Sequence, residues 1–425
     1  MDKYFRKINK IFSLNTPPLF KNVFKAVSTS ASILFFGKII QFLLLLYLAN
    51  YLGPKSFTFL ATSLVYAQLI SLIIVPGGQQ GLTASLVRAI TGNNQSVCKS
   101  ILIYSTSIFM FSIFSIFVLF ALLKSLFNIS FNSDFSLVTL IMLFTIFRTS
   151  ITRGYGFIFR SLFFSEILSP LVLFLLIVLI ANSNIAISVP IIWFFTYAVF
   201  EILVIFLCRK PILNSLNDKS SKIIFPINAF TETVLIQVAN IFRLTITRLD
   251  MVLLSFFSGP LIAAPYALAQ RFVQPITMLG RVLSNSTSPM LTRFHASGNY
   301  KNINQIILMS FVFVAAGSIF IISILYLLYA LVNIYLSSEY DLNKFLILYL
   351  IGSQLCLVLS APFVQHLLMT QKANKVILVN IVACILFILI VTLNLDKLSA
   401  INMAKYSFIA CLFMAFMSIY FSKRG

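Results

Sequence analysis

Long apolar stretches recur along the whole chain, and polar residues gather in the short segments between them. Stretches such as 171–180 and 381–391 are apolar on every side, without the alternation that marks a membrane β-strand. A helix needs only about 20 apolar residues to cross a bilayer. The pattern therefore predicts an all-α membrane protein with twelve transmembrane helices, at about residues 27–51, 56–77, 100–123, 136–159, 163–181, 187–208, 231–257, 262–288, 306–331, 345–369, 376–393 and 401–421.

Composition supports this interpretation and excludes several classes of protein. Of the 425 residues 60% are hydrophobic and 10% are charged, whereas a soluble protein carries about a quarter charged residues. The net charge of +21 is scattered among the predicted spans and forms no soluble basic domain, which argues against nucleic-acid binding. The five cysteines lie mostly inside apolar stretches and the histidines number two, so we expect buried cysteines and no metal site.

Basic residues predict the orientation of the spans. With the N-terminus inside, the inner segments hold twenty Lys and Arg, and the outer loops hold four, namely Lys55, Lys124, Lys344 and Lys397. Residues 1–26 are a basic segment without a cleavage signature, so we expect an uncleaved start. Both termini are therefore predicted to be cytoplasmic.

The chain divides into two halves with similar sequence features at matching positions. A polar segment at 209–230 separates six predicted spans at 27–208 from six at 231–425. Gly53-Pro54 and Gly259-Pro260 are 206 residues apart (259 − 53), and so are the glycines of Gly92-Asn93-Asn94 and Gly298-Asn299-Tyr300 (298 − 92). Because each half has an even number of spans, both halves face the same way, and the repeat predicts two parallel six-helix bundles. Transporters built from such repeats usually bind substrate between the bundles, at the membrane midplane, and expose it to each side in turn by rocking of the bundles.

Charged residues fall near the middle of several predicted spans. Six are cations, and one is an acid, Asp250. Six unpaired cations facing lipid would cost on the order of 15–20 kcal/mol, more than the net stability of about 5–15 kcal/mol of a folded protein. We therefore predict a shared hydrated cavity and a substrate-binding set of Lys38, Arg148, Arg243, Arg248, Arg271 and Arg281, with the neighbouring amides Gln41 and Gln274.

Structural alternatives remain for some of these residues. Arg281 could snorkel to the inner surface, and Arg248, about 140° around the helix from Arg243, could face a neighbouring helix. Asp250 could form a structural ion pair with an arginine of an adjacent span. Glu166 is predicted to lie near the inner end of its span, at the membrane interface.

The sign of the central charges points to an anion. The planar fork of arginine matches phosphate oxygens, and lysine acts as a point charge. A cavity between two six-helix halves is wider than an inorganic ion needs, and the amides on the same helix faces could bind sugar hydroxyls. The sequence thus predicts a large phosphate- or carboxylate-bearing substrate.

Local motifs resemble those of the polysaccharide exporters of the MOP superfamily, in particular the Wzx-type flippases of O-antigen and capsule units. They are Gly37-Lys38-Ile39-Ile40, Leu48-Ala49-Asn50-Tyr51-Leu52-Gly53-Pro54, Arg248-Leu249-Asp250, Ser258-Gly259-Pro260 and Pro265-Tyr266-Ala267-Leu268-Ala269. Thr58 stands where that family often has Gly, and Leu249 separates Arg248 from Asp250. These two departures affect the placement within the family.

The resemblance implies a V-shaped pair of bundles in the bacterial cytoplasmic (inner) membrane. It implies an undecaprenyl-pyrophosphate-linked oligosaccharide as substrate, flipped to the outer leaflet for lipopolysaccharide or capsule biosynthesis. Membrane lipids, a polysaccharide polymerase and chain-length machinery are the implied partners. No cofactor is expected; the embedded acids Asp250, Glu232 and Glu201 are the candidates for coupling to an H⁺ or Na⁺ gradient.

Two other classes of function stay open at this point. A membrane glycosyltransferase or polymerase needs catalytic groups on an outer loop, but the outer loops are short and their acids, Asp134, Glu339, Asp341 and Asp396, are far apart in the sequence. A multidrug exporter for organic cations would need a cavity of the opposite charge. A lipid II flippase remains within the favoured class, and no enzymatic activity is expected.

Overall fold

The structure is a computed structural model that describes residues 18–423, apart from 75–77, 92–93, 128–132, 183–187, 218–226, 297, 336–339, 341 and 371. Within these ranges every regular element is a helix and no strand is present. The first seventeen residues of the predicted basic segment lie outside the described residues. The prediction of an all-α fold is confirmed.

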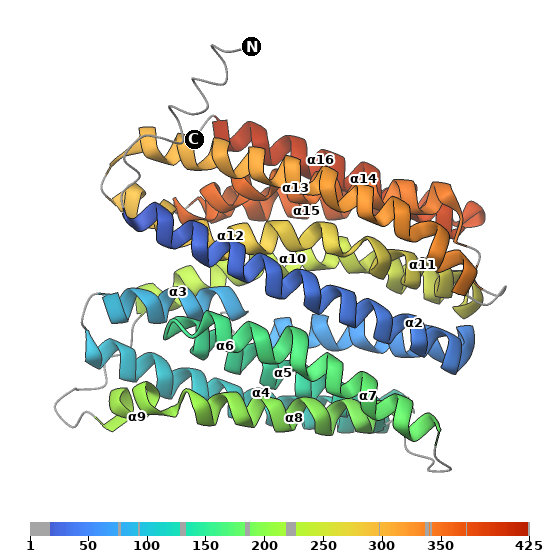
Figure 1. The fold of residues 1–425 in the computed structure, drawn as a ribbon, viewed down its shortest axis with the longest axis horizontal. Coiled ribbons are helices and arrows are strands. Elements are labelled where there is room, and N and C mark those ends of the chain that lie inside the picture. Colours follow the sequence, from blue (N-terminus) through green and yellow to red (C-terminus); the bar gives the residue numbers. More distant parts are fainter. Residues whose placement is uncertain are drawn as a thin grey trace.

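The first half of the chain forms a bundle of long helices. They are α2 (Pro18–Ile74), α3 (Gly78–Thr91), α4 (Gln95–Phe127), α5 (Ser133–Gly154), α6 (Ile158–Leu162), the π-helical turn η1 (Phe163–Leu168), α7 (Ser169–Ala181), α8 (Val189–Leu207) and the short α9 (Arg209–Asn217). In Figure 1 these helices run along the long axis of the molecule, and α4 to α9 lie in its lower part.

The second half forms the other bundle. It contains α10 (Ile227–Phe257), α11 (Pro260–Val273), α12 (Pro275–Ala296), α13 (Tyr300–Tyr335), α14 (Lys344–Met369), α15 (Ala373–Thr392), the short η2 (Leu395–Lys397) and α16 (Ala400–Lys423). In Figure 1, α13 to α16 lie at the top, and α10 to α12 lie between them and the first bundle, beside α2. The helix α2 of the first half and the helices α10, α11 and α12 of the second half therefore form the interface between the two bundles.

Helices cover all twelve predicted spans, but they differ in hydropathy. Nine helical segments in the described part of the chain are long and apolar enough to cross a membrane, and the first of them, Ser32–Ser71, contains two predicted spans joined at Gly53. The predicted seventh and eighth spans are not among the nine. The seventh, α10, carries Arg243, Arg248 and Asp250, and the eighth is broken into α11 and α12. Polar helices of this kind need protein or water beside them, not lipid.

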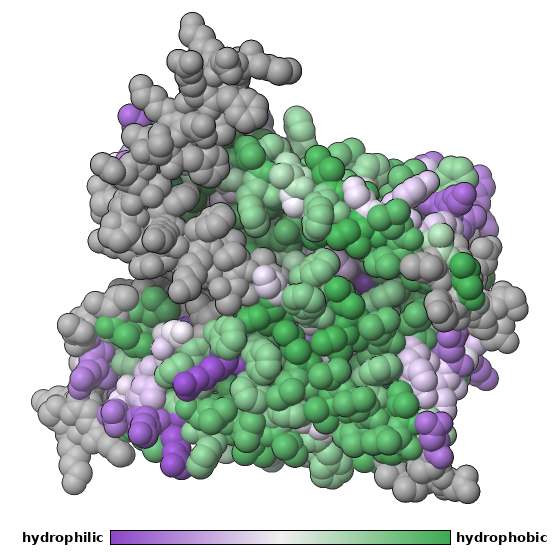
Figure 2. Space-filling view, in the orientation of Figure 1, coloured by the Kyte–Doolittle hydropathy of each residue, from purple (hydrophilic) through white to green (hydrophobic). Residues whose placement is uncertain are grey.

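Hydrophobic and hydrophilic residues are distributed over the surface as in a membrane protein. Figure 2 shows a broad hydrophobic zone across the middle of the molecule, with hydrophilic residues at both ends of the long axis. Large apolar side chains such as Phe111, Phe256, Ile319, Tyr326 and Phe416 are exposed in this structure. A contiguous apolar surface of this kind is covered by lipid in a multi-pass membrane protein.

The predicted repeat is visible in the backbone at its first pair of glycines. Gly53 has φ 71° and ψ 169°, and Gly259 has φ 82° and ψ 171°. A positive φ favours glycine because other residues are strained there. The two turns, 206 residues apart, therefore have the same backbone conformation at their glycine. Gly298 also has a positive φ, but its predicted counterpart Gly92 lies outside the described residues.

The two halves are held together at the end of the molecule that contains these turns. The Thr58 hydroxyl donates to the carbonyl oxygen of Pro260 (2.9 Å), and the Tyr340 hydroxyl donates to that of Ala49 (2.9 Å). The largest hydrophobic cluster contains residues from both halves, among them Leu48, Phe57 and Tyr266. By the predicted topology this closed end faces outward.

Candidate functional site

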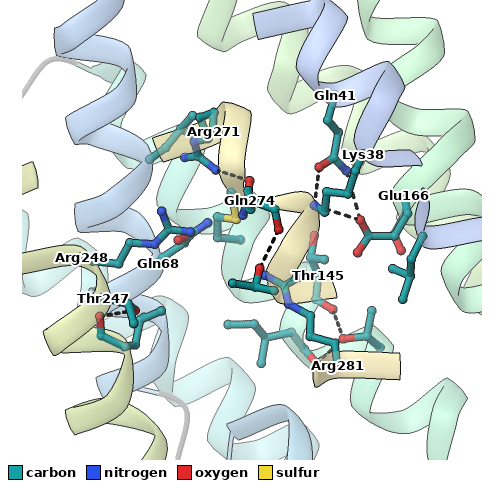
Figure 3. Close-up of a pocket in the computed structure, with 18 of the residues that line it drawn as sticks. Lys38, Gln41, Gln68, Thr145, Glu166, Thr247, Arg248, Arg271, Gln274 and Arg281 are labelled. Carbon is teal, nitrogen blue, oxygen red and sulfur yellow. Dashed lines mark hydrogen bonds and ion pairs between the residues drawn. The ribbon is translucent and has the colours of Figure 1, made fainter. Parts of the chain in front are cut away.

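A cavity of about 540 Å³ lies between the two halves. On the first half its wall comes from α2, α5, α6, η1 and α8, and on the second half it comes from α10, α11, α12 and α14. The parallel repeat predicts a site between the halves, as found here, and its place at the membrane midplane stays a prediction. Figure 3 shows side chains from both halves pointing into it.

Seven of the eight residues predicted to bind substrate line this cavity: Lys38, Gln41, Arg243, Arg248, Arg271, Gln274 and Arg281. Arg281 also lines the cavity, and Figure 3 shows its side chain among the other wall residues. The eighth residue, Arg148, is absent from the wall. Helical periodicity therefore located most of the cavity.

The four arginines of the second half form no ion pair with a carboxylate in the described part of the chain, although Arg248 and Arg281 interact at longer range with Asp250 and Glu166. Arg248 donates to the amide oxygen of Gln270 (3.1 Å), and Arg271 donates to that of Gln274 at the long distance of 3.5 Å. The guanidinium groups of Arg243 and Arg281 form no hydrogen bond or ion pair with the described residues; the hydrogen bond at Arg243 is to its carbonyl oxygen, from the Thr247 hydroxyl (3.2 Å). Arg281 lies close enough to repel each of the other three, and Arg248 also repels Arg271.

The first half carries the only carboxylate among the described residues of the cavity wall, and a lysine already pairs with it. Lys38 Nζ lies 3.4 Å from Glu166 Oε2 and donates to Gln41 Oε1 (2.5 Å), while Gln41 Nε2 donates to Glu166 (3.1 Å). The prediction that Glu166 is interfacial is wrong, because its side chain lies in the cavity. The wall thus has six cations, including Arg153, and one carboxylate, a formal surplus of five.

A close helix contact positions Glu166. Gly37 of α2 packs against the π-helical turn η1, and a Cβ built on Gly37 would lie 2.5 Å from the Glu166 carbonyl oxygen. The π turn displaces the backbone by one residue relative to an α-helix, as π-bulges at functional sites often do. The glycine and the π turn together bring Glu166 next to Lys38.

Replacing Gly37 with alanine should therefore separate α2 from η1. We expect a loss of about 1–3 kcal/mol, the usual cost of overpacking, measured as a lower unfolding temperature of the purified protein. Gly280→Ala is the matched control, because its new Cβ would lie 3.4 Å from the Cβ of Ala361, an ordinary contact. Equal unfolding temperatures for the two variants would contradict the role given to Gly37.

Arg148 and Glu201 require a correction of the prediction. Arg148 is 1% exposed and forms a two-pronged ion pair with Glu201, through Nε to Oε2 and through Nη2 to Oε1 (3.1 Å). Ser161 and Thr145 complete the hydrogen bonds of this pair. A buried pair of this kind needs such partners to offset desolvation. The pair lies inside the first bundle, so Arg148 does not face the cavity.

The other predicted acids lie in different surroundings. Asp250 is buried and accepts hydrogen bonds from the Tyr266 hydroxyl (2.5 Å), the Met251 amide and Gln270. It forms no ion pair with an arginine of the described residues, so the structural ion pair considered from the sequence is absent there. The side chain of Glu232 lies outside the described residues. A role in ion coupling stays a prediction for all three acids.

Several wall residues were missed from the sequence: Gln68, Arg153, Trp193, Tyr197 and Gln237. Arg153 belongs to the last turn of α5. Gln237, three residues before Asn240 and six before Arg243, could have been found by extending the polar face of α10. Trp193 and Tyr197 carry no such signal, because an aromatic residue in an apolar span is ordinarily packed. The described residues contain no group of three or more metal-ligating side chains.

Comparison with known proteins places the fold. No protein-family model matches the sequence, and no curated protein matches it significantly. The structure is similar to a multidrug resistance MATE family transporter of the MOP superfamily in its outward-facing conformation (TM-score 0.69, 13% identity, covering 94% of this chain and 95% of that one). It is also similar to the Vibrio cholerae MATE transporter VcmN in the bent form (TM-score 0.66, 15% identity, 96% and 98% covered). The chain therefore has the fold of the MATE transporters of the MOP superfamily.

Proposed function

We propose that this protein is a flippase that moves undecaprenyl-pyrophosphate-linked oligosaccharides across the bacterial cytoplasmic membrane. The observation that carries the proposal is a set of four arginines on the wall of a central cavity, none of which forms an ion pair with a described carboxylate. Desolvated like charges are costly unless a counter-charge joins them. A pyrophosphate provides that counter-charge and the oxygens that bind arginine in a bidentate geometry.

The size and composition of the cavity favour an organic anion over an inorganic one. Its volume of about 540 Å³ falls in the range of roughly 300–1,000 Å³ of sites for organic ligands. Six glutamine side chains line it beside the charges: Gln41, Gln68, Gln237, Gln270, Gln274 and Gln354. These amides suit sugar hydroxyls, and the lipid tail can stay in the bilayer while the head group crosses.

The cycle follows from the way the halves meet. In this structure, they are joined at the end that contains Gly53 and Gly259. We propose that the head group enters the cavity from the opposite, cytoplasmic side, and that rocking of the halves breaks the contacts of Thr58 and Tyr340 to expose it outward. An H⁺ or Na⁺ gradient would drive the return.

Multidrug export is the second candidate, because the similar solved structures include a multidrug resistance transporter. An organic cation would gain from Glu166 and from the aromatic side chains of the wall. It would also meet a formal surplus of five positive charges. That repulsion disfavours the second candidate.

Reconstitution distinguishes the two functions. Proteoliposomes would be loaded with undecaprenyl-pyrophosphate-linked oligosaccharide, and the sugar exposed on the outer leaflet would be followed with a membrane-impermeant glycosidase. We expect protein-dependent exposure of sugar, and no protein-dependent transport of ethidium in parallel vesicles. Ethidium transport without sugar exposure would overturn the proposal.

A further inference from the structure

The two walls of the cavity differ in chemistry. The second half contributes four arginines, whereas the first contributes two cations, one carboxylate and a mainly apolar surface that includes Leu44, Leu45 and Met142. Two aromatic residues of α8, Trp193 and Tyr197, belong to this first wall. A ligand that is anionic along its whole length would not need such a wall.

Trp193 and Tyr197 form a stacked pair. They lie one helical turn apart, with ring centroids 5.9 Å apart and ring planes at 21°. Tyr197 is also close enough to Glu166 to interact with its charge. Since Glu166 pairs with Lys38, the two aromatic rings lie near this lysine. The result is a stacked aromatic pair on the wall of the cavity, near Lys38, Gln41 and Glu166.

Trp193 has an unused hydrogen-bond donor. Its side chain is 7% exposed, and its indole Nε1 is buried without an acceptor in the described part of the chain. Buried tryptophan N–H groups usually have a partner, and an unpaired one is costly. The hydroxyls of Thr196 and Tyr197 lie one turn further along α8, but the Thr196 hydroxyl donates to the Ile192 carbonyl (2.7 Å), and neither hydroxyl accepts from the indole.

We propose that Trp193 and Tyr197 form a binding subsite for a sugar ring of the substrate. One face of a pyranose consists largely of C–H groups, which pack on an aromatic ring, and its rim carries hydroxyls that accept from an indole N–H. In the complex the Trp193 indole would turn so that its N–H donates to a sugar hydroxyl. This hydrogen bond would favour binding, because the N–H has no acceptor among the described residues of the free protein. The subsite rests on the proposed function, since it assigns the glycan of the same lipid-linked molecule.

The assignment orients the substrate across the cavity. The pyrophosphate lies against the arginines of α10, α11 and α12, and the first sugars lie against α8 of the other half. A single molecule then contacts both halves at once. Neither the pyrophosphate alone nor the sugar alone makes both sets of contacts, so the complete head group holds the two walls together more tightly than either part.

Fluorescence gives a direct test, because Trp193 is the only tryptophan of the chain. Purified protein would be titrated with undecaprenyl-pyrophosphate-linked oligosaccharide extracted from cells that produce the protein, and with undecaprenyl pyrophosphate without sugar. Native mass spectrometry would measure binding in parallel. We expect both lipids to bind, but only the sugar-bearing lipid to shift the Trp193 emission.

Substitutions separate sugar binding from phosphate binding. Trp193→Leu should weaken binding of the sugar-bearing lipid by about tenfold and leave binding of undecaprenyl pyrophosphate unchanged, while Trp193→Phe retains part of the preference. Phe195→Leu, an exposed position on the same helix, is the control and should change neither. If Trp193→Leu weakens both lipids equally, or if bare pyrophosphate shifts the emission as strongly, the subsite is refuted and the proposed function stands. If neither lipid binds the unmodified protein, both fail.

Discussion

Replacing Arg243 with alanine is expected to weaken binding of the pyrophosphate-linked lipid by about 10- to 100-fold and to reduce its translocation in proportion. Arg243 lines the cavity and its guanidinium has no hydrogen-bond or ion-pair partner among the described residues, so its whole donor set is available to the ligand. A hydrogen bond to a charged group contributes about 1.5–3 kcal/mol, which corresponds to this range of affinity. Native mass spectrometry and the proteoliposome assay measure the two effects.

Controls separate loss of the site from loss of the fold. Arg243→Lys keeps the charge but not the planar fork, so it should retain part of the affinity. Lys301→Ala removes a cation from an exposed position at the start of α13 and should change neither binding nor translocation. Arg243→Ala should unfold at a temperature no lower than the unmodified protein, because it relieves repulsion with Arg281. Unchanged translocation by Arg243→Ala would remove this residue from the mechanism.

Breaking the Arg148–Glu201 pair should cause the largest loss of stability. Glu201→Leu leaves a guanidinium buried in the first bundle without its counter-charge, at a cost of about 3–5 kcal/mol. We expect a low yield of folded protein and a markedly lower unfolding temperature. The experiment is a thermal melt followed by size-exclusion chromatography in detergent.

The double variant Arg148→Met with Glu201→Leu tests the reason for that loss. Replacing both partners by apolar residues of similar volume removes the uncompensated charge, so stability should largely return. Translocation should return with it, because neither side chain reaches the cavity. A stable double variant that has lost translocation would restore Arg148 to the substrate-binding set.

The helices and the cavity could be predicted from the sequence for a simple physical reason. Apolar length determines where a chain can cross a bilayer, and the cost of a buried charge requires Lys38, Arg243 and Arg271 to face a hydrated interior. The repeat was visible because the turn at Gly53 and the turn at Gly259 need the same unusual backbone conformation. These constraints are local or periodic, so a single sequence records them.

The pairing of charges could not be predicted in the same way. Arg148 and Arg243 both lie near the middle of a span, but Arg148 meets Glu201, a residue 53 positions away, and Arg243 meets no acid among the described residues. Which helices pack together decides this, and helical periodicity does not report it. Glu166 was misplaced because the π turn at 163–168 and the close contact with Gly37 move it inward.

The central claim is that the cavity selects a phosphate-bearing molecule by its uncompensated cations. The most direct measurement is competitive binding to the purified protein, observed by native mass spectrometry, of undecaprenyl-pyrophosphate-linked oligosaccharide, undecaprenol without phosphate, and tetraphenylphosphonium cation. The account predicts that only the pyrophosphate-linked lipid is retained, and that its retention falls as Arg243 and Arg271 are removed. Retention of the organic cation in preference to the pyrophosphate-linked lipid would contradict it.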